Sequence, residues 1–366
     1  MSTPNDAVSI PRRAEVIREF KGRGGRVAAV LPIHYPRALF RAFDILPVEV
    51  WGPPKIDASS AATHLQPYIC SIARNALAFV LGGGLDVADL IIVPHTCDSL
   101  QGLASVLIDF ITPARPVYPI YLPRGNRPSD LTFLASELRS LSNRLEQLTA
   151  YTPSETRLME CIEQEEAADR WLADLHQRRT ELPLSQYDLY RVLRSREFLP
   201  ADRLCALAET IIARAGGYPR RDDIPVLMSG IVPEPMEMLR SLEKMGGRVA
   251  SDDFACCGRR LYPAGRSSEP FVRMAESIIQ GPPDPMRGCS IQDRLAHLAR
   301  LAGTSGARGV VFYTIKFCEP ELFQLPALRT GLQEIGVRTL NLEVDLSDPL
   351  SQSALTRLEA FLEMIG

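Results

Sequence analysis

The sequence predicts an α/β protein with two parallel-sheet units and a helical segment between them. Two observations carry this prediction. Short, β-branched apolar runs alternate with helical patterns in both outer parts of the chain, and this alternation is typical of parallel sheets covered on both faces. The middle of the chain shows helical patterns without such runs. The expected units are residues 1–128, 129–219 and 220–366.

The first unit is expected to begin with a charged helix at residues 14–21. Strands are expected where short apolar runs end at turn residues, at 26–33, 47–51, 89–94 and 117–122. Helical patterns separate these runs, at 34–43, 67–81 and 96–111. Strands that alternate with helices in this way pair in parallel.

The middle segment is expected to be helical throughout, at 130–149, 154–178, 183–195 and 201–215. Gly216 and Gly217 are expected to end the last of these helices, because glycine is common just after a helix. The alternation then resumes. Strands are expected at 224–229, 248–251, 309–313 and 339–344, and helices at 234–245, 289–301, 326–335 and 354–365.

Composition narrows the class of protein. The 366 residues are 46% hydrophobic and 23% charged, with a net charge of −3. This balance suits a soluble enzyme and argues against nucleic-acid binding, which needs clustered positive charge. No apolar run reaches the roughly 18 residues of a membrane span, and no signal-peptide core opens the chain, so we expect a cytoplasmic protein. The chain contains no P-loop motif for ATP.

The eight cysteines are the most informative residues. Six of them follow an expected strand or open an expected helix: Cys70, Cys97, Cys256, Cys257, Cys289 and Cys318. Ligands bind at the carboxyl ends of parallel strands, and a helix start favours a thiolate. Cys161 and Cys205 lie inside helical patterns and are interpreted as packing residues. Without a CxxC pair, the six remain either buried apolar residues or ligands for soft metals.

Histidine and arginine supply the other candidate site residues. His95 lies two residues before Cys97, and His34 follows the first expected strand, so both are candidates for catalysis. Arg259 and Arg260 follow the acidic pair at 252 and 253. This segment is either a solvated turn or a loop that binds phosphate, which the planar guanidinium holds with two hydrogen bonds.

Four motifs occur in order and carry a family resemblance: Y-I-C-S-I-A-R-N-A-L (68–77), P-H-T-C-D-S (94–99), S-D-D-F-A-C-C-G-R-R (251–260) and K-F-C-E-P-E-L-F (316–323). The carboxy-terminal L-T-R-L-E-A-F-L-E (355–363) follows them. In these residues the chain resembles the 2-hydroxyacyl-CoA dehydratase family, which also contains subunits of ATP-dependent benzoyl-CoA reductase. The resemblance extends from about residue 26 to the end.

The resemblance implies two flavodoxin-like domains with a [4Fe–4S] cluster between them, held by Cys70, Cys97 and Cys318. It also implies a lyase or oxidoreductase of anaerobic metabolism, in which the chain pairs with a homologous second subunit or a copy of itself. A separate ATP-hydrolysing activator would deliver a low-potential electron, which makes a ketyl radical on the acyl-CoA substrate before dehydration. The reductase branch would use such electrons to reduce an aromatic ring.

Two alternatives stay open. One branch of the family carries a double-cubane [8Fe–9S] cluster on six cysteines and acts on small molecules as a homodimeric reductase. Cys256, Cys257 and Cys289 would complete that set. The branch has one thiol in the segment that corresponds to 256–257 and two in the segment that corresponds to 288–290, whereas this chain has two in the first segment and one in the second. The other alternative is a non-catalytic scaffold subunit whose cysteines hold no cluster or a structural one.

Overall fold

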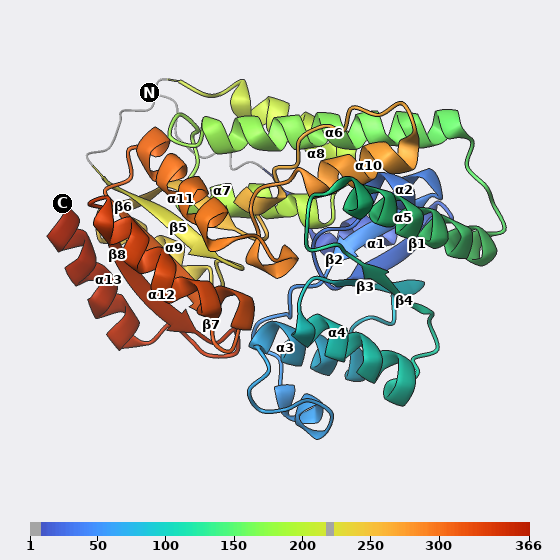
Figure 1. Cartoon of the computed structure of the whole chain (residues 1–366), viewed down its shortest axis with the longest axis horizontal. Helices are drawn as coiled ribbons and strands as arrows, with labels where there is room; N and C mark the ends of the chain where they lie inside the picture. The colour runs from blue at the N-terminus through green and yellow to red at the C-terminus, as the bar shows by residue number, and fades with distance from the viewer. Residues whose placement is uncertain (1–8, 217–222) are drawn as a thin grey trace.

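The described residues form two four-stranded parallel sheets, seen side by side in the computed structural model of the chain (Figure 1). The structure describes residues 9–216 and 223–366. The first sheet contains β1 (Arg26–Val30), β2 (Ile45–Glu49), β3 (Leu90–His95) and β4 (Val117–Tyr121). The second contains β5 (Ile224–Gly230), β6 (Gly247–Phe254), β7 (Gly309–Ile315) and β8 (Arg338–Val344). The predicted α/β class with two parallel sheets is therefore confirmed.

Both sheets share one strand order. They run β2-β1-β3-β4 and β6-β5-β7-β8, which reproduces the first four strands of the flavodoxin-like order. The central strands are almost wholly buried, because helices cover both faces of a parallel sheet, and every residue of β7 is buried. The carboxyl ends of β3 and β7 therefore occupy equivalent places in the two sheets.

Helices cover the sheets and fill the segment between them. The first unit contains α1 (Arg13–Gly22), α2 (Arg37–Ala42), α3 (Ser71–Leu81) and α4 (Asp98–Ser105), which runs into a π-helix at Val106–Ile111. The middle segment contains α5 (Pro128–Thr149), α6 (Glu155–Gln177), α7 (Gln186–Arg194) and α8 (Ala201–Ile212). The last unit contains α9 (Glu237–Lys244), α10 (Pro270–Ile279), α11 (Ile291–Ser305), α12 (Glu319–Glu334) and α13 (Gln352–Ile365).

The middle segment connects the two sheets. Helix α6 packs on α2 of the first unit, and α5 packs on α10, which comes from the last third of the chain. Met274 and Ile278 of α10 join the apolar core under the first sheet, together with Leu134 and Leu138 of α5. The expected unit boundary at residue 219 and the expected helix stop at Gly217 lie outside the described residues.

Three elements differ from the sequence-based expectations. Helix α10 was not expected; it begins at Pro270, where the Glu269 side chain accepts a hydrogen bond from the N–H of Val272. Helix α12 begins at Glu319 instead of residue 326, and it tolerates Pro326 inside. Strand β6 continues through Asp252 and Asp253, because buried cationic side chains offset the charge of those carboxylates.

Buried and half-buried ion pairs are among the contacts that join the two sheet units. Arg260 pairs with Glu49 at the end of β2. His34 Nε2 lies 2.8 Å from Asp284 Oδ2, and Arg74 on α3 pairs with Asp345 beyond β8 at 2.7 Å. These contacts fix the two carboxyl edges with respect to each other. None of the helices that the structure describes is long and apolar enough to cross a membrane.

Candidate iron–sulfur site at the sheet edges

Three cysteines each occupy the position just before a helix. Cys70 precedes α3, Cys97 precedes α4 and Cys318 precedes α12. None of the three thiols makes a capping hydrogen bond, but backbone N–H groups in the first turn of each helix act to lower the thiol pKa. These N–H groups therefore act in favour of the thiolate, although burial outweighs them in the absence of a bound cation.

The three thiols lie close enough to influence one another although they are distant in sequence. Burial raises the pKa of Cys70, and burial followed by the charge of Cys70 raises that of Cys97 to about 12. Burial and then the charges of Cys70 and Cys97 raise the pKa of Cys318. These charge interactions link the three cysteines that the family resemblance grouped, and their joint role as cluster ligands stays a prediction.

The donor set fits an iron–sulfur cluster. Cys70 and Cys318 are buried and Cys97 is half-buried, and thiolates are the ligands that hold such clusters. Within the described part of the chain, no three His, Cys, Asp or Glu side chains are close enough to hold a single metal ion. A cluster of several irons joins thiolates that stand farther apart. Its positive charge would also offset the mutual repulsion that raises the thiol pKa values.

Contacts between the units hold the start of α3 against the second sheet unit. The backbone N–H of Leu346 donates to Ser71 Oγ at 3.1 Å, next to the Arg74–Asp345 ion pair. Ser347 Oγ donates to Asn75 Oδ1 at 3.2 Å one turn later. Figure 1 shows α3 of the first unit near β7 of the second. Cys70 is therefore positioned by the second unit as well as the first.

Strained turns flank the candidate site. Phe317, directly before Cys318, has φ of 62°, and Ile33 and His34 after β1 have φ of 58° and 60°. Bulky residues rarely adopt this left-handed conformation, which costs on the order of 1 kcal/mol per residue. In each case the turn lets the chain leave a central strand and reverse immediately at the carboxyl edge of the sheet.

The remaining cysteines have different surroundings. Cys256 and Cys257 are fully buried, with their sulfur atoms 3.4 Å apart. The main charged or polar neighbours of this pair include Arg194 and Asp252. Cys289 is half-buried, and its backbone carbonyl accepts a hydrogen bond from Gln324 at 2.9 Å. Participation of these three thiols in a larger cluster stays a prediction.

The two candidate histidines have contrasting environments. His34 is buried, with Nε2 near Asp284 and Nδ1 2.7 Å from the Tyr262 hydroxyl, so both ring nitrogens have partners. His95 ends β3, its ring lies against Tyr121, and its buried Nε2 has no hydrogen-bond partner. Burial lowers the pKa of both histidines. In His34 this effect of burial outweighs Asp284, which acts to raise the pKa. His95 therefore has a ring nitrogen free for another molecule.

The arginine pair does not form a solvated turn, and that expectation is wrong. Arg259 and Arg260 are almost completely buried. Arg259 donates to Asp253, Asp284 and Glu321, whereas Arg260 donates to Glu49. Because carboxylates already surround both guanidinium groups, the geometry gives them a structural role, and the phosphate-binding role stays a prediction without a supporting contact.

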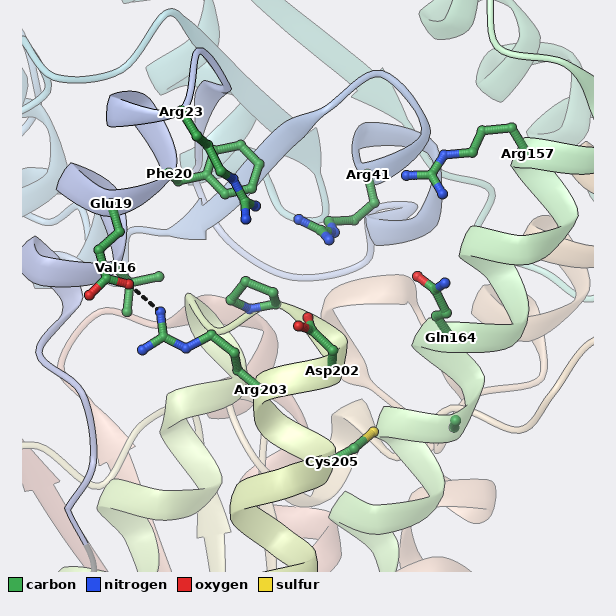
Figure 2. A pocket seen from close by; sticks show the side chains of 12 residues that line it. Val16, Glu19, Phe20, Arg23, Arg41, Arg157, Gln164, Asp202, Arg203 and Cys205 are labelled. Carbon is green, nitrogen blue, oxygen red and sulfur yellow. Dashed lines mark hydrogen bonds and ion pairs between the residues drawn. The ribbon is translucent and has the colours of Figure 1, made fainter.

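A separate basic pocket lies among α1, α2, α6 and α8 (Figure 2). It has a volume of about 480 Å³, and Arg23 and Arg41 both approach the Phe20 ring in it. Arg203 on its rim pairs with Glu19 at 2.6 Å. None of the three cysteines at the helix starts lines this pocket.

A second group of basic residues was also missed by sequence reasoning. Arg124 and Arg287 sit beside glycines in the segments R-G-N (124–126) and R-G-C (287–289), and Arg300 lies on α11. All three line one pocket next to Cys289. An arginine beside a glycine in two separate loops is the only signal in the sequence, and it does not show that the loops meet.

The fold is that of a two-sheet α/β protein with three cysteines at helix starts along the carboxyl edges of its sheets. The family model described as "2-hydroxyglutaryl-CoA dehydratase, D-component" matches residues 32–365, so the chain belongs to that family. The sequence-based recognition of the family is thereby confirmed.

Three curated relatives illustrate the range of the family. Lactoyl-CoA dehydratase subunit beta of Anaerotignum propionicum is 25% identical, over all of this chain and 98% of that protein. (R)-2-hydroxyglutaryl-CoA dehydratase subunit beta of Acidaminococcus fermentans is 23% identical, over 96% of this chain and 95% of that protein. A subunit of the benzoyl-CoA reductase of Thauera aromatica is 23% identical, over 84% of this chain and 83% of that protein.

Proposed function

We propose that the chain is the iron–sulfur subunit of a 2-hydroxyacyl-CoA dehydratase or a benzoyl-CoA reductase-like enzyme. Cys70, Cys97 and Cys318 hold its [4Fe–4S] cluster in this proposal. The observation that carries it is that three cysteines, two buried and one half-buried, stand at the starts of three helices from two sheet units and act electrostatically on one another. Relatives named as dehydratase and reductase subunits support the reaction class.

The cluster, when bound, supplies a low-potential one-electron carrier at the edge of both sheets. The protein's own residues prepare that place. First-turn N–H groups of α3, α4 and α12 stabilise thiolates at Cys70, Cys97 and Cys318. Burial of Cys70 and Cys318 keeps water from the sulfur atoms. His95, two residues before Cys97, has an unpartnered ring nitrogen that suits it to accept or donate a proton.

The proposal includes partners. Several relatives are named as beta subunits, which supports assembly with a second, related subunit or with a copy of this chain. The chain has no P-loop motif, so a separate ATP-hydrolysing activator is expected to supply the electron. The substrate is an acyl-CoA. A site for such chemistry must also exclude water. The expected location of the protein is the cytoplasm.

Iron and acid-labile sulfide analysis after anaerobic purification tests the proposal. About four irons per chain support the [4Fe–4S] assignment, about eight favour the double-cubane reductase, and none favours the scaffold subunit. Reconstitution with a partner subunit, activator, ATP and a strong reductant then tests the reaction. Acyl-CoA turnover that proceeds equally well without ATP and activator contradicts the proposed electron supply.

A further inference from the structure

A cavity of about 570 Å³ lies between the loop after β4 and the start of α11. The first wall is formed by residues 124–126, and the second by residues 287–290 and α11. Its basic side chains are Arg124, Arg287, His297 and Arg300. We call this cavity the arginine pocket, and its residues come from segments that are far apart in the sequence.

Positive charge in the arginine pocket is only partly compensated. His297 Nε2 lies 3.6 Å from Asp253, and Arg124 forms an exposed ion pair with Asp98. Among the described residues that line it, Asp293 is the one acidic residue, and its side chain accepts a hydrogen bond from Ser290 Oγ at 2.7 Å. Arg300 Nη2 lies 2.9 Å from His297 Nδ1, a ring nitrogen and not a carboxylate. The pocket therefore attracts anions.

Arg287 is left with an unsatisfied donor. Its Nη2 donates to the Ile279 carbonyl at 3.2 Å, but its Nε is buried without a hydrogen-bond partner. A buried N–H without an acceptor costs about 1–3 kcal/mol. Among the described residues no carboxylate forms an ion pair with Arg287, so its guanidinium charge stays available to an anion in the cavity.

Backbone geometry adds to the attraction for anions. Helix α11 spans fifteen residues, and Ser290, which caps its start, lines the pocket together with Gly288. The first N–H groups of a helix have no acceptors within the helix and bind phosphate readily. Gly288 has φ of 74°, and a Cβ there would lie 3.2 Å from the Arg124 side chain, so glycine allows the two loops to approach.

The arginine pocket lies alongside the three-cysteine site. Arg124 is 3.5 Å from Asp98, the residue after Cys97, in an exposed ion pair that costs little to break. On the other side, Gln324 of α12 donates to the carbonyl of Cys289, which lines the pocket. The helices that begin at Cys97 and Cys318 therefore both reach its border.

We propose that the arginine pocket binds the phosphate groups of the coenzyme A part of the substrate. This assignment rests on the proposed function, which makes the substrate an acyl-CoA. Coenzyme A carries a pyrophosphate and a separate 3′-phosphate, and arginine binds phosphate oxygens in pairs through its planar fork. Three arginines and a helix start provide donors for more than one phosphate.

Isothermal titration calorimetry on the full-length, anaerobically purified chain tests the assignment. Coenzyme A, 3′-dephospho-coenzyme A, pantetheine, ADP and inorganic phosphate serve as probes. Coenzyme A should bind the wild type, and R287Q and R300Q should each weaken its binding by about tenfold or more, because each loses charge-assisted hydrogen bonds. Pantetheine binding should not change in these variants, and R300K should recover part of the coenzyme A affinity.

R23Q is the matched control, because Arg23 is a cationic side chain in the other basic pocket (Figure 2) and should leave coenzyme A affinity unchanged. Wild-type affinity in R287Q and R300Q, or ADP and inorganic phosphate that bind as tightly as coenzyme A, would overturn the assignment. No binding of coenzyme A to the wild type would overturn it as well. Iron content measured on the same samples separates this failure from a failure of the cluster assignment.

Discussion

The two sheets share a strand order but use the polar residues at their carboxyl edges differently. At the first sheet, Cys70 and Cys97 stand at helix starts without an ion-pair partner. At the second, the residues after β6 are fully buried, and Arg259 is enclosed by carboxylates. A strand-end position alone therefore does not identify a functional residue. What distinguishes the two cases is whether other side chains of the protein already form hydrogen bonds or ion pairs with the polar group at the strand end.

At the second sheet, Arg259 belongs to a connected set of buried charged side chains. Arg259 and Arg294 both contact Asp253 and Glu321, and Arg259 also reaches Asp284. All of these side chains are almost fully buried. Removing one member of a buried pair leaves the other charge buried without a partner, so these residues contribute to folding.

The largest expected effect comes from R259M. It should lower the free energy of unfolding by about 3–5 kcal/mol, because Asp253 and Glu321 would lose a buried cationic partner. Urea denaturation monitored by circular dichroism measures the change. R124Q is the control and should change stability by less than about 1 kcal/mol, since its ion pair with Asp98 is exposed. A loss below about 1 kcal/mol in R259M would contradict the structural role.

The pH dependence of stability tests the contact between Glu49 and Arg260. Burial acts to raise the pKa of Glu49, but Arg260 and Arg37 outweigh it and lower the pKa from 4.5 to about 2. The stabilising contribution is therefore present above about pH 4.5 and is lost as the pH falls toward about 2, roughly 3 kcal/mol in all.

Urea unfolding of the cluster-free chain at several pH values measures this contribution. E49Q removes the titrating group and should be less stable than the wild type near neutral pH. Its stability should also fall less steeply than that of the wild type between about pH 5 and pH 2.5. Parallel pH profiles for E49Q and the wild type would show that Glu49 does not titrate with a lowered pKa.

His34 should behave as part of the buried charge network. H34Q loses hydrogen bonds to Asp284 and Tyr262, and its free energy of unfolding should fall by about 1–3 kcal/mol. Iron content per folded chain should stay at the wild-type level. Wild-type stability combined with lost turnover would instead indicate that His34 acts directly on the substrate.

His95 should show the smallest effect on folding. Its Nε2 has no partner to lose, so H95A should change the free energy of unfolding by about 1 kcal/mol or less. Turnover of the reconstituted enzyme should fall by about a hundredfold or more if the ring moves a proton. Full turnover in H95A would remove His95 from the catalytic residues.

The sequence was sufficient for most of the fold because its signals are local. Short apolar runs such as residues 309–313 marked the strands, and β7 covers that run. Helix α10 was missed because its ten residues follow a segment rich in proline, glycine and serine, which is typical of a loop. The second sheet repeats the strand order of the first. The carboxyl ends of β3 and β7, and the helix starts that follow them, therefore occupy equivalent positions in the two sheets.

The site was less predictable because its contacts are not local. Strand ends and helix starts identified six cysteines as candidates, but only the family resemblance selected Cys70, Cys97 and Cys318 from them. Adjacent arginines are usually exposed, and the burial of Arg259 depends on carboxylates at 253, 284 and 321. The arginine pocket likewise forms where residues 124–126 and 287–290 lie close together, and no pattern in the sequence predicts that contact.

Iron retention in C97A and C256A tests the central contrast most directly. After anaerobic purification, C256A should keep about four irons per chain, because the proposed [4Fe–4S] cluster does not use the buried pair Cys256 and Cys257. C97A should lose most of its iron while C161A, a buried helical control, keeps it. Iron at the wild-type level in C97A, or iron lost from C256A and retained in C97A, would contradict the account.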